Sequence, residues 1–230
     1  MWQKFVDSFV LNFVKDNRWQ YLTNGLAVTL KLTIFAVILG FLIGFFIAMV
    51  RSTHENTGKL VILDKLCGIY LTVIRGTPVV VQLLIIYFVI FGSVRISKSL
   101  VAIIAFGVNS GAYQAEIFRS GILASPRGQF EAGRSLGFNY RETMTYIVMP
   151  QAFRNVIPAL ANECIGLLKE TSIAGYIALE DLTKGGDIIR SRTYSAFMPL
   201  MAVALIYLAL VLIMTRFEKY LERRLKQSER

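Results

Sequence analysis

Cysteine and histidine are scarce in this chain, which has two Cys and one His among 230 residues. Cys67 and Cys164 lie in apolar stretches without metal-ligand spacing, so we expect small buried residues rather than a metal site. His54 lies in a polar connector with no other ligand nearby. No segment supplies the Gly-x-x-x-x-Gly-Lys-Ser/Thr loop that cradles nucleotide phosphates, so ATP chemistry is not expected in this chain. A nucleophile–base pair typical of an enzyme is also not found.

Charged residues make up only 17% of the chain, while 55% of residues are hydrophobic and the mean hydropathy is +0.55. A soluble domain seldom combines such a composition with long apolar runs, so the composition indicates a membrane protein. The net charge of +10 would suit nucleic-acid binding in a soluble protein. Here the basic residues lie mostly between and after apolar runs, where they set topology, so a nucleic-acid partner is not expected.

Five apolar stretches predict membrane-spanning helices, each long enough to cross a hydrocarbon core of about 30 Å. They cover residues 24–50, 60–91, 100–122, 151–169 and 196–217. Aromatic residues at helical spacing predict an amphipathic helix within residues 1–21. The mixed stretch 170–195 contains Gly185-Gly186 and is interpreted as a loop with short amphipathic turns. We therefore expect one all-α transmembrane domain over residues 1–230.

The distribution of basic residues predicts the topology. Five spans place the two termini on opposite sides of the membrane. The connectors on the C-terminal side carry 14 Lys and Arg residues, against 9 on the N-terminal side. Because the richer side is usually cytoplasmic, we expect the N-terminus outside, the C-terminus inside and the loop 123–150 in the cytoplasm. Gly40 and Gly44 form a Gly-x-x-x-Gly pair in the first span, which predicts a close helix contact.

The polar loop 123–150 carries a spaced pattern of small, acidic and apolar residues. Its members are Glu131, Ala132, Gly133, Gly137, Ile147 and Pro150. The pattern resembles the cytoplasmic coupling loop of ABC importer permeases, which reads Glu-Ala-Ala, three residues, Gly, nine residues, then Ile-x-Leu-Pro. Every spacing is met; Gly133 replaces Ala, and Met149 replaces Leu.

A coupling element has to be rigid, and the residues of this loop suit that requirement. Residues 127–144 can form a helix–turn–helix in which Gly137 permits the sharp turn. Ala132 and Gly133 would allow a partner surface to approach closely, and Glu131 offers a charge to a basic group of that partner. Pro150 would then start the fourth span, where its missing N–H costs little.

Three further segments are similar to the histidine/arginine/glutamine type of ABC importer permease: 75–82, 111–122 continuing through Gly128-Gln129, and 168–172. The resemblance covers most of the chain and implies a type I ABC importer permease in the bacterial inner membrane. It also implies a second permease subunit, identical or a sibling, and cytoplasmic ATPase subunits that carry ATP and Mg²⁺. An extracytoplasmic amino-acid-binding protein would deliver the substrate.

The second span contains a candidate break at Thr77-Pro78. Thr at an N-cap followed by Pro at the first helical position is typical of a helix start. A broken helix would direct free N–H groups and a positive dipole end toward a ligand carboxylate, as in other transporters with discontinuous helices. A continuous helix kinked at Pro78 is the alternative, and the sequence leaves both open.

Glu163 is the most informative polar residue, because it lies about 17 Å along the fourth span among Ala, Ile and Leu. A carboxylate at that depth is expensive unless it is paired or faces a cavity, and is functional by default. Asn162 adds polar capacity beside it. If Glu163 meets an ammonium or guanidinium and the break at Thr77 holds the α-carboxylate, the substrate is a basic amino acid: arginine, lysine or histidine.

The alternative is that Arg75, at similar depth in the second span, neutralises Glu163. The site would then suit a neutral amino acid such as glutamine. An ion-coupled secondary transporter is a further class, but it needs a coupling-ion site, and Glu163 is the only clear acid at mid-membrane depth in the predicted spans.

Position along the helices gives five more candidates for lining the substrate site. Tyr70 is two turns before Thr77, and Gln82 is one turn after Pro78. Three small residues near the middle of the third span would leave space for a ligand: Ser110, Gly111 and Ala112. Each could equally serve helix packing.

Overall fold

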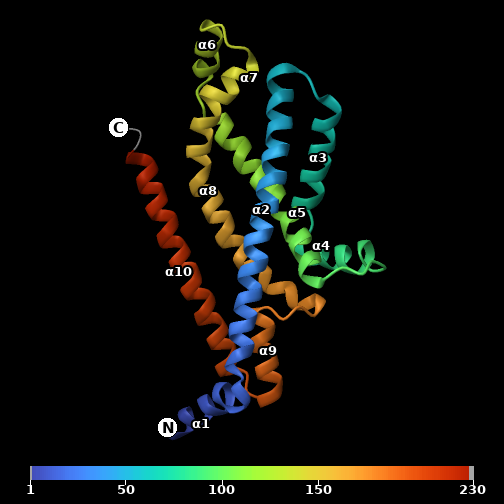
Figure 1. Cartoon of the computed structure of the whole chain (residues 1–230), viewed down its shortest axis with the longest axis vertical. Helices are drawn as coiled ribbons and strands as arrows, with labels where there is room; N and C mark the ends of the chain where they lie inside the picture. Colours follow the sequence, from blue (N-terminus) through green and yellow to red (C-terminus); the bar gives the residue numbers. More distant parts are fainter. Residues whose placement is uncertain (1, 228–230) are drawn as a thin grey trace. The chain divides into compact units, whose positions relative to one another are not determined.

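The structure is a computed structural model that describes residues 2–227. Every regular element within this range is helical (Figure 1). The α-helices are α1 Trp2–Phe9, α2 Trp19–Thr57, α3 Val61–Arg75, α4 Val79–Ile85, α5 Lys98–Leu123, α6 Arg127–Ser135, α7 Tyr140–Thr143, α8 Met149–Glu170, α9 Leu182–Thr193 and α10 Phe197–Gln227. Short π and 3₁₀ segments are η1 Val10–Val14, η2 Lys15–Asn17, η3 Ile86–Ile90, η4 Met144–Val148 and η5 Thr171–Ile177.

Long apolar helices are the expected form of this chain, because backbone groups in lipid must be satisfied within their own segment. Among the described residues, α2, α5 and α10 are long and apolar enough to cross a membrane, and α3 with α4–η3 adds a fourth span if this bent pair counts as one. The predicted fourth span falls in α8, which has 22 residues but is not among the qualifying helices. Charged residues such as Arg154 and Glu163 lower its apolar content, so the count of five stays a prediction.

The chain forms two compact units, each built from three separate stretches of sequence. Unit 1 contains the residues up to Ala36, then Pro78–Phe106 and Ile165–Met214. Unit 2 contains Val37–Thr77, Gly107–Cys164 and the residues from Thr215 onward.

Unit 1 is built around α9. Leu182 and Ile189 of this helix are completely buried and pack with Leu22, Phe13 and Val203. The predicted loop over 170–195 is therefore wrong in part, since Leu182–Thr193 is an α-helix. Gly185 lies inside this helix although glycine is a weak helix former. Glycine is needed at this position because a Cβ there would lie 2.3 Å from the carbonyl oxygen of Tyr21.

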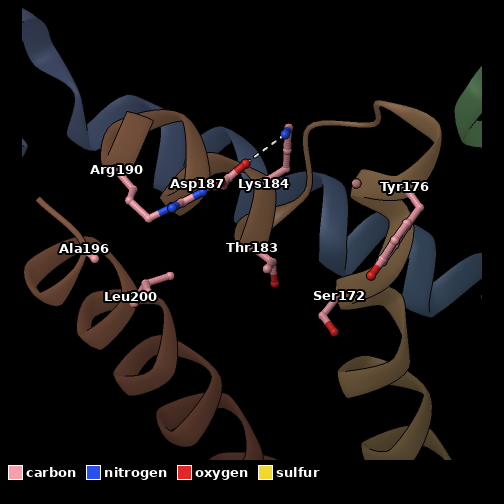
Figure 2. Close-up of a pocket in the computed structure, with 9 residues that line it drawn as sticks. Ser172, Tyr176, Thr183, Lys184, Asp187, Arg190, Ala196 and Leu200 are labelled. Carbon is pink, nitrogen blue, oxygen red and sulfur yellow. Dashed lines mark hydrogen bonds and ion pairs between the residues drawn. The ribbon is translucent and has the colours of Figure 1, made fainter. Parts of the chain in front are cut away.

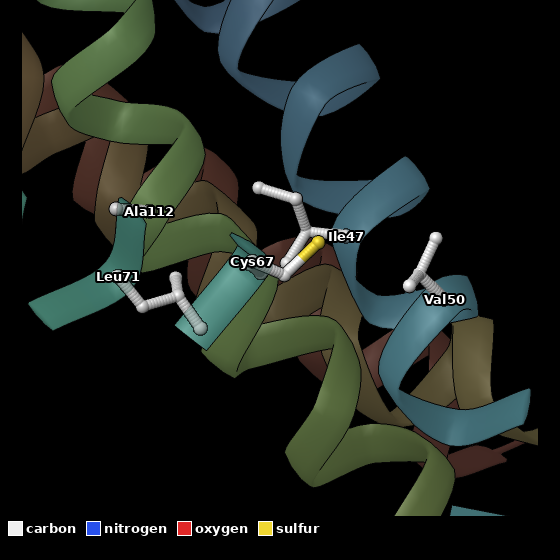
Figure 3. Close-up of a cluster of buried hydrophobic side chains, with 6 residues drawn as sticks. Ile47, Val50, Cys67, Leu71 and Ala112 are labelled. Carbon is white, nitrogen blue, oxygen red and sulfur yellow. The ribbon is translucent and has the colours of Figure 1, made fainter. Parts of the chain in front are cut away.

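Unit 2 is built around close contacts between α2 and α5. A Cβ at Gly40 would lie 2.7 Å from Nε2 of Gln114, and one at Gly44 would lie 2.8 Å from the backbone nitrogen of Ala115. The predicted glycine-mediated contact is confirmed. α3 adds Cys67 and Leu71 to an apolar cluster with residues of α2 and α5 (Figure 3).

The second span is broken rather than kinked. α3 ends at Arg75, and α4 begins at Val79 after Pro78, which has φ −65° and ψ 136°. Thr77 does not take the predicted N-cap position; Pro78 does, and Oγ1 of Thr77 donates instead to the carbonyl of Val73 at 2.8 Å. The residue before a proline is disfavoured in the α region, which favours a helix end before Pro78.

The coupling loop forms the predicted helix–turn–helix of α6 and α7. Gly137 has φ +83°, and the two bonds of a Schellman motif close α6: Phe138 N–H donates to the carbonyl of Gly133 at 3.0 Å, and Gly137 N–H to that of Arg134 at 2.9 Å. Asn139 then starts α7 with a reciprocal capping box to Glu142.

Pro150 does not start a separate helix. α7, η4 and α8 follow one another without interruption from Tyr140 to Glu170. A proline cannot donate to the residue four positions earlier, and the backbone adapts through the π-helical segment Met144–Val148, where Met149 N–H donates to Met144. The prediction that the fourth helix begins near Pro150 is corrected to Tyr140.

Candidate functional site

Glu163 in unit 2 is the acceptor at the end of a short chain of hydrogen bonds. Ser110 Oγ donates to Oε1 of Glu163 at 2.8 Å, and Gln114 Nε2 donates to the same Ser110 oxygen at 3.0 Å. Ser110 and Gln114 are buried, and Gln114 also contacts the carbonyl of Val37. Because Ser110 accepts from Gln114, its own proton is directed at the carboxylate, and the network holds Glu163 in a defined orientation.

Three other predicted lining residues pack between helices of unit 2. The Tyr70 hydroxyl donates to the carbonyl of Val108. A Cβ at Gly111 would lie 2.8 Å from Cγ2 of Ile43 and 3.1 Å from the Tyr70 hydroxyl. Ala112 is buried in the apolar cluster of Figure 3. These contacts are those of helix packing, and a lining role for these residues stays a prediction.

The remaining predicted substrate residues differ in exposure. Asn162 and Thr77, both in unit 2, are exposed. Gln82 belongs to unit 1, where its side chain is only 7% exposed. The structure therefore brings Ser110 and Glu163 into direct contact and places Tyr70, Gly111 and Ala112 in the packing around α5.

Arg75 lies in an ion-pair network of unit 2. Its Nη1 is 3.4 Å from Oε1 of Glu116, and its guanidinium lies over the ring of Tyr113. Glu116 also faces Arg51 and Arg119, each at 3.9 Å. Glu116 thus supplies a countercharge to Arg75. Sequence reasoning missed this network, although a glutamate within the predicted span 100–122 was a signal for it.

Sequence reasoning also missed Gln114, which it treated only as part of the matched segment 111–122. An amide four residues after Ser110 occupies the same helix face, and this spacing could have identified the pair.

The coupling residues divide into exposed and packed ones. Glu131, Ala132 and Pro150 are exposed, and Ile147 is half-buried. Gly133 is buried, and a Cβ there would lie 2.6 Å from Oγ1 of Thr143. The small residue at position 133 therefore serves the contact between α6 and α7, and its predicted contact with a partner stays a prediction.

A separate pocket of about 570 Å³ lies in unit 1 (Figure 2). Ser172, Tyr176 and Thr183 line it, together with an ion triad on α9. Nζ of Lys184 donates to Oδ2 of Asp187 at 2.9 Å, and Nε of Arg190 donates to Oδ1 of Asp187 at 3.0 Å. These hydrogen bonds, from Lys184 first and then Arg190, hold the pKa of Asp187 below its ordinary value. None of the predicted site residues lines this pocket.

Comparison with known proteins gives the family. Residues 40–227 match the family described as binding-protein-dependent transport system inner membrane component. The chain belongs to this family, and it is a multi-pass inner-membrane protein with the type I ABC permease fold. The resemblance to ABC importer permeases is thereby confirmed.

Individual relatives support the assignment. The chain is 37% identical over 211 residues to the arginine transport system permease protein ArtQ of Bacillus subtilis, covering 91% of this chain and 94% of the relative. It is 36% identical to the putative glutamine transport system permease protein GlnP of Rickettsia typhi, covering 89% and 93%. A crystal structure of an amino acid ABC transporter with histidines matches with a TM-score of 0.82 at 42% identity, covering 89% and 94%.

Proposed function

We propose that this chain is the membrane-spanning subunit of an ATP-driven importer that moves a polar, basic L-amino acid into the cell by alternating access. Relatives named for arginine and glutamine transport support an amino-acid substrate. The observation that carries the basic class is the Glu163 carboxylate, which the Gln114–Ser110 chain orients within unit 2.

A carboxylate recognises a substrate cation through charge-assisted hydrogen bonds, which are about twice as strong as neutral ones. The ion pair between Arg75 and Glu116 supports this reading. Since Glu116 supplies a countercharge to Arg75, neutralising Arg75 does not require Glu163. Arginine, lysine and histidine all present the matching cation.

Glutamine is the alternative substrate, since a neutral amide can also donate to a carboxylate and a Rickettsia relative carries that name. A secondary transporter is a weaker alternative, because the matching family is described as part of a binding-protein-dependent transport system.

The start of α4, which belongs to unit 1, is a second and separate candidate contact for the substrate. The first N–H groups of a helix have no intrahelical partner, and in α4 the first bonds run from Val81 and Gln82 back to Pro78. The N–H groups of Val79 and Val80 precede these bonds. We place the substrate α-carboxylate at this helix start, where the dipole favours an anion.

The hairpin α6–α7 is the proposed contact with a cytoplasmic ATPase subunit, which would bind ATP and Mg²⁺. Glu131 and Ala132 are exposed there. The uninterrupted helix from Tyr140 would carry a displacement of the hairpin to Glu163. A second permease subunit would complete the membrane pathway, and an extracytoplasmic binding protein would deliver substrate. This arrangement requires the N-terminus outside and the C-terminus in the cytoplasm.

The test is calorimetric titration of arginine, lysine, histidine and glutamine into the purified permease–ATPase complex. Glu163→Gln should weaken arginine binding at least about tenfold, since a charge-assisted bond is lost. Glu131→Gln removes an equal charge from the hairpin and is the matched control. It should leave arginine binding unchanged while lowering transport-coupled ATP hydrolysis.

Tight glutamine binding that is indifferent to Glu163→Gln would refute the basic class and favour the glutamine alternative. If no amino acid binds to the complex and amino-acid transport persists without ATP, the proposal of an ATP-driven importer is refuted.

A further inference from the structure

A second polar pocket, of about 480 Å³, lies in unit 2 where the turn before α6 meets α8. Its lining is strongly polar and comes from two stretches of sequence. The lining residues are Ala124, Ser125, Pro126, Gln129, Gln151, Arg154 and Asn155. None of the proposed substrate or coupling residues is among them.

Ser125 is the unusual member of this lining. It is 6% exposed, and within the described part of the chain its hydroxyl has no hydrogen-bond partner. Burying a hydroxyl without a hydrogen-bond partner is energetically costly. Such groups are rare in folded proteins, and each calls for an explanation, such as a ligand that supplies the partner.

Among the side chains that the structure describes around the pocket, one carries a positive charge and the others include amide donors. Arg154 is exposed and forms no ion pair within residues 2–227. Asn155 is also exposed, and Gln129 accepts from Gln151 at 3.3 Å, which leaves the Gln129 amide hydrogens for a ligand. No carboxylate lines the pocket, so its chemistry favours an anion.

The start of α6 adds backbone donors on the same side. Pro126 is the N-cap residue and provides no side-chain cap, and both Pro126 and Gln129 of the first turn line the pocket. The start of this nine-residue helix therefore borders the pocket. Unpaired N–H groups at a helix start, together with the helix dipole, are a common anion site.

We propose that this pocket binds a phosphate-type oxyanion, held by Arg154, the Ser125 hydroxyl and the start of α6. A tetrahedral oxyanion offers several acceptor oxygens to donors that come from different directions, as they do here. The phosphate belongs either to free inorganic phosphate or to a phospholipid headgroup. Occupancy links α6 to α8 and stiffens the base of the hairpin, independently of which amino acid is transported.

The test uses the full-length permease, delipidated in a maltoside detergent. Inorganic phosphate is titrated against chloride at equal ionic strength, and phosphatidylglycerol against diacylglycerol, which lacks phosphate. Thermal unfolding and native mass spectrometry report binding. Arg154→Gln and Ser125→Ala should each lower the apparent affinity about tenfold, because each removes a bond to a charged ligand. Arg141→Gln, an exposed arginine of α7 outside the pocket, should change it less than about twofold.

Ser125→Ala also separates a ligand role from a purely structural one. Without phosphate, removing an unpartnered hydroxyl should leave the unfolding temperature unchanged or raise it; with phosphate, the variant should gain less stability than the parent protein. Stabilisation by inorganic phosphate assigns the free anion, and stabilisation by phosphatidylglycerol alone assigns the headgroup. Stabilisation by neither probe, or equal stabilisation of the parent and both variants, overturns the proposal.

Discussion

Pro78 lies inside the predicted second span and Pro150 at the predicted start of the fourth, and the backbone accommodates these two prolines in opposite ways. At Pro78 the helix stops, and α3 and α4 are separate. At Pro150 the helix continues, and α7, η4 and α8 form one run. A proline therefore does not decide by itself whether a helix breaks.

The residues before each proline account for the difference. Gly76 and Thr77 precede Pro78; Gly76 is a weak helix former, and the Thr77 hydroxyl donates to the end of α3. Upstream of Pro150, the capping box at Asn139 starts the helix firmly. The π-helical segment Met144–Val148 then accommodates Pro150, which has no backbone N–H to donate.

The difference suits two tasks. The break leaves N–H groups at the start of α4 without intrahelical partners, as a ligand site needs. The uninterrupted run gives a continuous helical connection from the hairpin to Glu163, as coupling needs. Four predictions test this contrast.

The largest expected effect is on amide exchange at the two prolines. Pro150→Ala creates an amide inside a continuous helix, which should be protected from exchange. Pro78→Ala creates one at an N-cap, which should exchange about a hundredfold faster. Hydrogen–deuterium exchange with mass spectrometry measures both. Equal protection from hydrogen exchange at positions 78 and 150 would contradict a broken helix at one proline and a continuous helix at the other.

The next effect concerns the contact that braces the continuous helix. A Cβ at Gly121 of α5 would lie 2.1 Å from Cγ1 of Val156 in α8. Gly121→Leu should overpack this contact and lower the free energy of unfolding by roughly 1–3 kcal/mol, measured by thermal unfolding in detergent. Gly68→Leu is the control, because nothing lies within 4 Å of a Cβ there. A loss of equal size in the control contradicts the packing argument.

A smaller loss is expected at the start of the continuous helix. Asn139→Ala removes the capping box and should cost about 1 kcal/mol, seen as a lower unfolding temperature and weaker stimulation of ATP hydrolysis by substrate. Glu142→Gln keeps a side chain able to complete the box and should cost less. If both variants lose the same amount, the cap is not what fixes this helix start.

The smallest stability effect is expected at the break. Thr77→Val removes the exposed bond to Val73 and should cost less than about 0.5 kcal/mol. Thr72→Val is closely matched, since Oγ1 of Thr72 donates to Gly68 in the same helix at 2.9 Å. Arginine titration of the two variants in the permease–ATPase complex should weaken only for Thr77→Val. Unchanged affinity in both would exclude the Thr77 side chain from the site.

Much of the fold followed from the sequence alone. The long apolar runs predicted α2, α5 and α10, and the spacing from Glu131 to Pro150 predicted the hairpin and its family. Gly137 was assigned to the turn because a positive φ is a local property that glycine alone adopts easily. The Glu163 position was read from depth, since lipid makes an isolated carboxylate expensive.

Only the tertiary structure decided which groups meet. It paired Ser110 with Glu163 and Arg75 with Glu116, placed Gly133 against Thr143 and made a helix of Leu182–Thr193 around Gly185. Local propensity argued against that helix, and no spacing rule predicted those pairs. The physical reason is that contacts between distant segments depend on how helices pack, while spans and turns depend on neighbouring residues.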